Sequence, residues 1–205
     1  MTTLAVIAKQ PLPGRAKTRL HPPLSLEQAA DLAACAIDDT LDSLGAVPAT
    51  RRVLLFDGVA DRPLMDGWEV IPQVSGGLDE RLGALFDACD GPLVLVGMDT
   101  PQVSPDHLRP IFSAWPDEVD AWIGPASDGG FWALAMREPR GDLIRGVAMS
   151  QDDTGLRQRL RLEEAGLRVG TLPTLDDVDT MADALRVAAI APWTRFAARM
   201  CSVVA

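Results

Sequence analysis

The sequence predicts an α/β fold of three layers, in which helices cover both faces of a mostly parallel central sheet. Apolar runs alternate with amphipathic stretches along the whole chain. Several of the apolar runs are continuous, as in strands that are covered on both faces. The resulting β-α-β-β-α-β order requires crossover connections, which place helices on the two faces of a parallel sheet. The 205 residues show no linker or internal repeat, so we expect one domain over residues 1–205.

The expected strands are apolar runs, some closed by a glycine or a proline. The run over 92–97 ends at Gly97 and is the most strand-like of the chain, while the run over 68–71 is stopped by Pro72. A Gly-rich segment over 124–130 connects the two runs on either side of it. The strands are expected over residues 4–8, 52–56, 68–71, 92–97, 119–123, 131–136 and 167–172.

The expected helices carry start and stop signals. Ser25 and Gln28 have the spacing of a capping box, and Gly45 ends that helix. Ser104 and Pro105 suit the N-cap and first position of another, and Thr180 suits an N-cap. Helices are expected over residues 25–45, 79–89, from 104, over 152–165 and 180–190, and as a short final helix from 192.

Composition excludes several classes of protein. The net charge is −10, whereas a protein that binds nucleic acid usually carries a basic surplus on one face, so we expect no nucleic-acid partner. No apolar run reaches the ~20 residues of a membrane span. The N-terminus lacks a basic segment followed by a long apolar one, and the three cysteines show no metal-ligand spacing. We therefore expect a cytoplasmic protein with free thiols.

A basic loop follows the first expected strand and predicts a phosphate site. The chain has 17 arginines but two lysines, Lys9 and Lys17, and both lie in this loop with Gly14 and Arg19. Such a loop can surround a diphosphate with backbone N–H groups and neutralise it with Lys17 and Arg19. A solvated basic turn is the alternative. The glycine spacing is not that of a Walker A loop.

Two acidic segments predict a metal site. Asp99 comes directly after a buried strand, at the edge of the sheet where ligands of such folds bind. Asp179 lies in the acidic run over 176–179 before a helix. Carboxylates are ligands that Mg²⁺ and Mn²⁺ prefer, usually shared with phosphates. The alternative is that Asp99 stabilises its own turn and that the acidic run complements a helix dipole.

Two glycine-containing segments complete the candidate site. Asp128, Gly129 and Gly130 connect two expected strands and could bind an acceptor, with Asp128 as a general base, or could form only a hairpin. A second segment could bind the base or ribose of a nucleotide, or be merely a flexible loop. Its candidate residues are Gln73, Gly76 and Gly77.

The order of these motifs resembles the glycosyltransferase-like family of radical-SAM/selenodomain-associated transferases, over roughly residues 4–190. The motifs are Lys9…Pro13-Gly14…Lys17-Thr18-Arg19-Leu20, Gly97…Asp99…Pro101, Gly124-Pro125-Ala126…Asp128-Gly129-Gly130-Phe131 and Asp177-Val178-Asp179-Thr180. The basic loop and the Asp-Val-Asp-Thr element also resemble phospholactate guanylyltransferases. The resemblance implies a nucleotide-diphospho-sugar transferase fold of the GT-A type. It also implies that Gly14, Lys17 and Arg19 hold phosphates and that Asp99 and Asp179 hold the metal. Met149 stands where members of the family often have Trp.

Three functions remain open from the sequence. The first is a metal-dependent transferase with a nucleotide-sugar donor and a small-molecule acceptor, with Lys17, Asp99 and Asp128 as catalytic residues. The second is a nucleotidyltransferase, which joins a nucleoside triphosphate to a small phosphorylated acceptor and releases pyrophosphate. The third is a non-catalytic nucleotide-binding protein. The apolar tail over 200–205 could pack on a partner, so a homodimer is possible.

Overall fold

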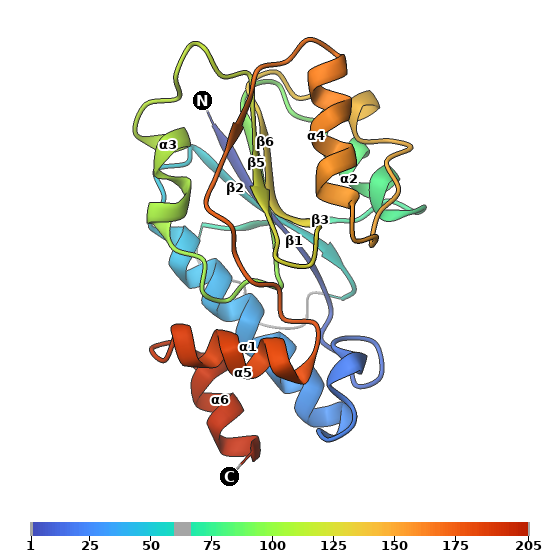
Figure 1. Cartoon of the computed structure of the whole chain (residues 1–205), viewed down its shortest axis with the longest axis vertical. Coiled ribbons are helices and arrows are strands. Elements are labelled where there is room, and N and C mark those ends of the chain that lie inside the picture. The colour runs from blue at the N-terminus through green and yellow to red at the C-terminus, as the bar shows by residue number, and fades with distance from the viewer. Residues whose placement is uncertain (1, 60–66, 205) are drawn as a thin grey trace.

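The computed structural model describes residues 2–59 and 67–204, and within them seven strands form one sheet (Figure 1). Their order across the sheet is β3-β2-β1-β4-β6-β5-β7. Neighbouring strands are parallel except where β6 pairs with β4 and β5. The mostly parallel sheet that the sequence predicts is therefore confirmed. The strands are β1 Thr3–Lys9, β2 Arg51–Asp57, β3 Glu69–Pro72, β4 Leu93–Gly97, β5 Ala121–Pro125, β6 Phe131–Met136 and β7 Val169–Thr171.

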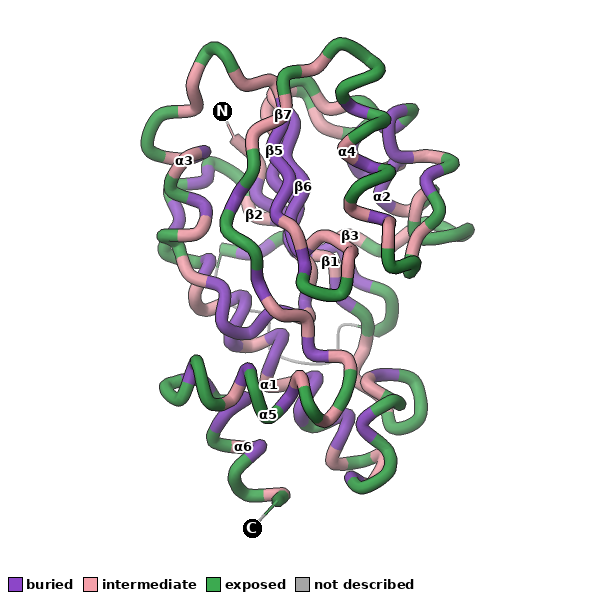
Figure 2. The backbone as a smooth tube through the Cα atoms, in the orientation of Figure 1, coloured by how far each residue is buried: buried purple, intermediate pink, exposed green. Residues whose placement is uncertain are grey.

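Helices cover both faces of the sheet, as predicted. α1 and α3 cover one face, α2 and α4 cover the other, and α5 and α6 pack on the outer side of α1 (Figures 1 and 2). Alternation along β1 divides the core, because Leu4 and Val6 pack under α1 while Ala5 packs under α2. The helices are α1 Leu26–Gly45, α2 Leu78–Asp87, α3 Arg109–Phe112, α4 Thr154–Glu164, α5 Met181–Ile190 and α6 Arg195–Val204.

The helix-start signals of the sequence differ in outcome. Ser25 and Gln28 form the expected capping box at the start of α1, and Thr180 caps α5 with its side chain. The helix expected from Ser104 is instead a 3₁₀ turn, Pro105–Leu108, followed by the four residues of α3. The final helix begins at Arg195, three residues later than Pro192 predicts.

The expectation that the C-terminal tail packs on a partner is wrong for Met200. That residue belongs to α6, is 1% exposed, and packs in the cluster that α6 forms with α1 and α5 of the same chain. The reason is that α1 has a second apolar face, formed by Leu32 and Ala36, which α5 and α6 cover. Oligomeric state stays a prediction. In the part of the chain that the structure describes, no helix is long and apolar enough to cross a membrane.

Candidate active site

A pocket of about 800 Å³ opens at the carboxyl ends of β1, β2 and β4, which is the edge where ligands of open α/β sheets bind. Its lining comes from the loops after β1 and β4, from the β5–β6 connection, and from the segment before α5. The volume is in the range of small-molecule and cofactor sites. The loops that the sequence singles out as informative therefore meet at one place in the fold.

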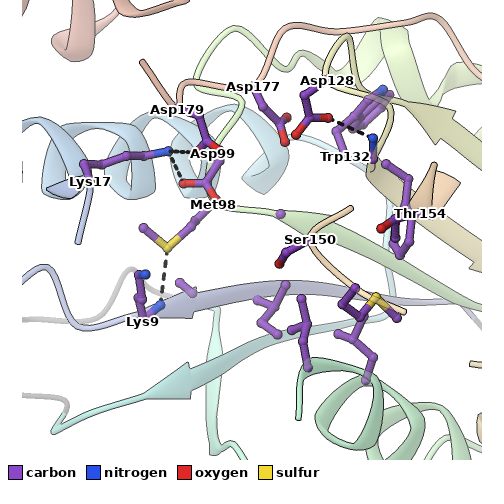
Figure 3. A pocket seen from close by; sticks show the side chains of 18 of the residues that line it. Lys9, Lys17, Met98, Asp99, Asp128, Trp132, Ser150, Thr154, Asp177 and Asp179 are labelled. Carbon is purple, nitrogen blue, oxygen red and sulfur yellow. Dashed lines mark hydrogen bonds and ion pairs between the residues drawn. The ribbon is translucent and has the colours of Figure 1, made fainter. Parts of the chain in front are cut away.

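Lys17 reaches into the charged part of this pocket from one side, with its ammonium group against Asp99 (Figure 3). Its side chain is 5% exposed, and its Nζ lies 2.5 Å from Asp99 Oδ1 and 3.8 Å from Asp179 Oδ1. The same ammonium group donates a hydrogen bond to the backbone oxygen of Val178. Lys17 adopts a left-handed backbone conformation, with φ of 52°, in the turn that leads to the 3₁₀ turn Thr18–Leu20. The three acceptors account for a nearly buried positive charge.

The segment before α5 is held in place by backbone hydrogen bonds. The Val178 N–H donates to the Asp99 oxygen at 3.0 Å, and the Leu175 N–H donates to the Pro125 oxygen at 3.1 Å. Val178 is fully buried, so the residues on either side of it face the pocket. Asp177 and Asp179 therefore reach the site together because side chains alternate along an extended segment.

Asp177 is the most strongly perturbed carboxyl of the pocket. Burial, together with the neighbouring charges of Asp99 and Asp128, raises the pKa of Asp177 to about 7. Its Oδ1 atom is buried and has no hydrogen-bond partner among the described residues. Asp177 and Asp128 point toward each other at the same side of the pocket (Figure 3). Crowded carboxylates of this kind favour a bound proton or a cation.

Asp128 belongs to the tight connection between β5 and β6. Its Oδ1 accepts a hydrogen bond from the Gly130 N–H at 2.8 Å, which fixes the carboxylate at the rim of the pocket. The Asp-Gly-Gly segment thus forms the hairpin connection and also lines the pocket, while acceptor binding by this segment stays a prediction. Gly129 has φ of +89°, and a Cβ there would lie 1.8 Å from the backbone oxygen of Asp152. Its lack of a side chain lets the segment before α4 approach.

The predicted site residues divide into two groups. Those that line the pocket are Lys9, Lys17, Arg19, Gln73, Asp99, Asp128, Gly130 and Asp179. Gly14, Gly76, Gly77 and Gly129 are outside the pocket lining, at bends of the loops that carry their neighbours. Gly14 and Gly76 have positive φ, and Gly77 is the N-cap of α2.

Asp57 and Arg81 are not among the residues that the sequence predicts for the site, and Asp177 enters that prediction only as part of the acidic run over 176–179, yet all three line the pocket. A signal existed for two of them. Asp57 is the last residue of β2, after four buried residues, just as Asp99 follows β4. Asp177 is two residues from Asp179, which is the spacing that puts two side chains on one side of an extended segment.

The carboxylates suit a divalent cation in chemistry but are not grouped for one in the structure. Among the described residues, no three His, Cys, Asp or Glu side chains are arranged to hold a metal ion. The ammonium group of Lys17 lies instead against Asp99 and near Asp179. The oxygen of Asp177 that lacks a partner is the observation in favour of a cation, since hard oxygen donors are what Mg²⁺ and Mn²⁺ take.

Comparisons with known proteins agree with this fold and site. The chain is 29% identical to a 2-phospho-L-lactate guanylyltransferase of Halomicrobium mukohataei, over 83% of this chain and 79% of the relative. A solved structure from Desulfovibrio desulfuricans G20, of a protein proposed to be a nucleotide-diphospho-sugar transferase, superposes with a TM-score of 0.86. That likeness has 25% identity and covers 98% of this chain and 94% of the other.

A third likeness concerns the fold alone. A manganese complex of Rv0371C from Mycobacterium tuberculosis H37Rv is 23% identical, with a TM-score of 0.53 over 91% of this chain and 96% of the other. The fold, the pocket and these likenesses together identify the protein as a transferase. Its fold is that of the nucleotide-diphospho-sugar transferases. The chain belongs to the DUF2064 family, which is described as uncharacterised proteins conserved in bacteria. The model of this family matches residues 40–151.

Proposed function

We propose that this transferase is a nucleotidyltransferase, which joins a nucleoside triphosphate to a small phosphorylated acceptor and releases pyrophosphate. The observation that carries the proposal is the nearly buried Lys17, held by Asp99 in a pocket large enough for both substrates. The guanylyltransferase name of the Halomicrobium relative favours this reaction over transfer of a sugar.

The reaction forms one bond and breaks another at the α-phosphorus. A phosphate oxygen of the acceptor attacks that atom, and the bond to the β-phosphate oxygen breaks, so the electron pair leaves with pyrophosphate. Phosphate monoesters carry close to two negative charges at neutral pH, so the attacking oxygen needs no general base. Asp128 is therefore not required as a base in this reaction.

Lys17 and Arg19 supply positive charge where the triphosphate becomes more negative. Electrostatic stabilisation of that kind is usually the largest single contribution to catalysis, and it is stronger in a site that excludes water. Lys17 is nearly buried, whereas Arg19 is 73% exposed and hydrogen-bonds to Asp179 at 2.9 Å. We assign phosphate binding to both residues and to Lys9, which lines the same pocket.

Asp99 and Asp177 would hold a divalent cation, with Asp179 beside them. Mg²⁺ or Mn²⁺ bound there would supply positive charge that offsets the charge of the phosphates. Since Lys17 now pairs with Asp99, a cation at this place requires its ammonium group to turn from the carboxylates toward the phosphates. Metal binding and phosphate binding are thus coupled in this proposal.

The test is release of pyrophosphate from each nucleoside triphosphate, with phosphorylated small acceptors and Mg²⁺ or Mn²⁺. Asp99→Asn should abolish turnover while its circular dichroism matches the wild type. Asp90→Asn, at an exposed position outside the pocket lining, should keep full activity. Full activity of Asp99→Asn would contradict the role of that carboxylate.

Transfer of a sugar is the second candidate. The likeness to the Desulfovibrio structure favours it, as does Asp128, which stands at the pocket rim where a base for an acceptor hydroxyl could act. Slow hydrolysis of a nucleotide sugar, without pyrophosphate release from any triphosphate, would select this candidate. Membership of the radical-SAM/selenodomain-associated transferases, which the sequence resembles, remains our proposal within this second candidate. A cytoplasmic location and a homodimer are likewise proposed.

A further inference from the structure

The pocket continues past Lys9 to a second polar end, which lies between the carboxyl end of β2 and the first turns of α2. Asp57, Gln73 and Arg81 line this end. It is separate in the fold from the acidic cluster, because β2 and β4 pair with opposite sides of β1. Two strand spacings put the ends of β2 and β4 about 10 Å apart. A nucleotide whose phosphates lie at Lys17 would place its base toward this polar end.

Gln73 cannot offer its donor to a ligand in this structure. Its Nε2 donates to the backbone oxygens of Ala8 at 2.8 Å and Leu55 at 3.1 Å. Both protons of the amide are therefore used by the ends of β1 and β2. The sequence suggests that Gln73 binds a base, but only its side-chain carbonyl is left for such a role. That carbonyl already accepts a hydrogen bond from Arg81 Nη1 at 3.1 Å.

Arg81 connects the fixed amide to Asp57. Its Nη1 also donates to Asp57 Oδ2 at 3.0 Å, and its Nε donates to the Gly76 oxygen at 3.0 Å. These bonds fix the guanidinium group from three sides, and the guanidinium group in turn orients the carboxylate. The Asp57 side chain remains 47% exposed, so part of its acceptor capacity faces the pocket.

A carboxylate that is fixed in this way discriminates between nucleobases. An ionised carboxylate only accepts hydrogen bonds, and its two oxygens suit a pair of adjacent donors. Guanine has such a pair, its N1–H and its 2-amino group. Adenine and cytosine have an unprotonated ring nitrogen at the corresponding edge, and uracil has a carbonyl on each side of its single N–H.

We infer that Asp57 is the residue that selects guanine, by accepting hydrogen bonds from the N1–H and the 2-amino group of the base. The inference rests on the proposed function, because it requires the phosphates of the same nucleotide to lie at Lys17. Arg81 and Gln73 are positioning residues for this carboxylate. A base that presents an acceptor to Asp57 sets two acceptor atoms against each other and leaves the exposed part of the carboxylate without a donor from the ligand, and such mismatches are strongly rejected.

The experiment is calorimetric titration of the wild type with GTP, ITP, XTP and ATP in the presence of Mg²⁺. ITP lacks the 2-amino group, and XTP has a carbonyl in its place. The wild type should bind GTP most tightly, ITP about tenfold or more weakly, and ATP more weakly still. This order of affinities is measured on the wild type, so it does not depend on whether a variant folds.

The decisive variant is Asp57→Asn, which replaces one acceptor oxygen with a donor. It should lose about tenfold or more in affinity for GTP and gain affinity for XTP, since an amide donates to the carbonyl of xanthine and accepts from its N1–H. Asp90→Asn is the matched control and should bind all four nucleotides as the wild type does. Changes in the temperature of unfolding would show whether either variant is destabilised.

The outcomes separate the inference from the proposed function. A wild type that binds GTP and ATP equally, or an Asp57→Asn variant that folds and keeps its preference for GTP over XTP, would overturn the assignment of Asp57 and leave the nucleotidyltransferase proposal standing. Failure of every triphosphate to bind would overturn both.

Discussion

The contacts of Lys17 explain why a lysine stands at this position more fully than its charge alone does. A nearly buried ammonium group must be paired, and Asp99, Asp179 and the Val178 oxygen are its partners. The sequence could predict that Lys17 and Asp99 meet, because each follows a parallel strand and those strand ends share one edge. It could not predict their direct ion pair, which depends on a left-handed backbone conformation at Lys17 itself.

Asp177 should make the stability of the metal-free protein depend on pH. Its folded pKa, about 7, is higher than the ~4 of an exposed aspartate. The folded state thus binds the proton more tightly, and stability falls as pH rises from about 4 to about 7. The expected slope is at most about 1.4 kcal/mol per pH unit. Urea unfolding at pH 5, 6 and 7 with EDTA measures it.

The control for this pH dependence is Asp177→Asn, which cannot titrate. The variant should lose the part of the slope that Asp177 contributes and should be more stable than the wild type at pH 7. Parallel curves for the two proteins would show that Asp177 titrates normally. Carboxyl groups outside the pocket contribute equally to both curves, so the difference isolates Asp177 together with its effect on the neighbouring Asp99 and Asp128.

Gly129 should tolerate no side chain. A Cβ there meets the Asp152 backbone oxygen at 1.8 Å, so Gly129→Ala must displace the segment that leads to α4. Gly166 has a similar φ of +83°, but a Cβ there has nothing within 4 Å. Gly166→Ala should cost about 1 kcal/mol for the backbone conformation, and Gly129→Ala about 1–3 kcal/mol more. Equal losses of unfolding free energy in urea would contradict this close approach.

At the scale of elements, α1 shows where sequence patterns stop being informative. Ala33, Ile37 and Leu41, which recur at helical spacing within the predicted helix over 25–45, pack under the sheet. The second face, with Leu32 and Ala36, was missed because apolar residues all round a helix do not indicate which neighbour covers which side. The start of α6 was equally out of reach, since its N-terminus is capped by Asp39, a residue 157 positions before Phe196.

Asp39 should determine how firmly α6 is held. Its oxygens accept from the Arg195 N–H at 3.0 Å and the Phe196 N–H at 2.8 Å, and the residue is 8% exposed. Asp39→Ala leaves two N–H groups at the helix start without partners and should cost about 2 kcal/mol. Urea unfolding measures the loss.

Asp31 provides the comparison for Asp39 on the same two helices. Its carboxylate pairs with Arg199 of α6 at 2.6 Å, but its side chain is 58% exposed. Exposed ion pairs contribute little, so Asp31→Ala should cost less than about 1 kcal/mol. A cost equal to that of Asp39→Ala would mean that the buried cap is not what holds α6.

At the scale of the whole molecule, we propose that residues 1–205 unfold as one domain, as the sequence predicts. The central strands come from distant parts of the chain, since β1 lies between β2 and β4 and β4 pairs with β6. α1 joins the sheet on one side to α5 and α6 on the other. A division of the chain at any point would expose apolar surface on both parts, which favours a single cooperative transition.

Two probes test this cooperativity during urea unfolding. Circular dichroism follows the helices, and fluorescence follows tryptophans that lie in different parts of the fold, from Trp68 beside β3 to Trp193 between α5 and α6. The two transitions should coincide, and calorimetric and van't Hoff enthalpies should agree. Separate midpoints would contradict the single domain. An early transition that appears in Asp39→Ala and is absent from the wild type would assign the weak unit to the C-terminal helices, because that cap joins α6 to α1.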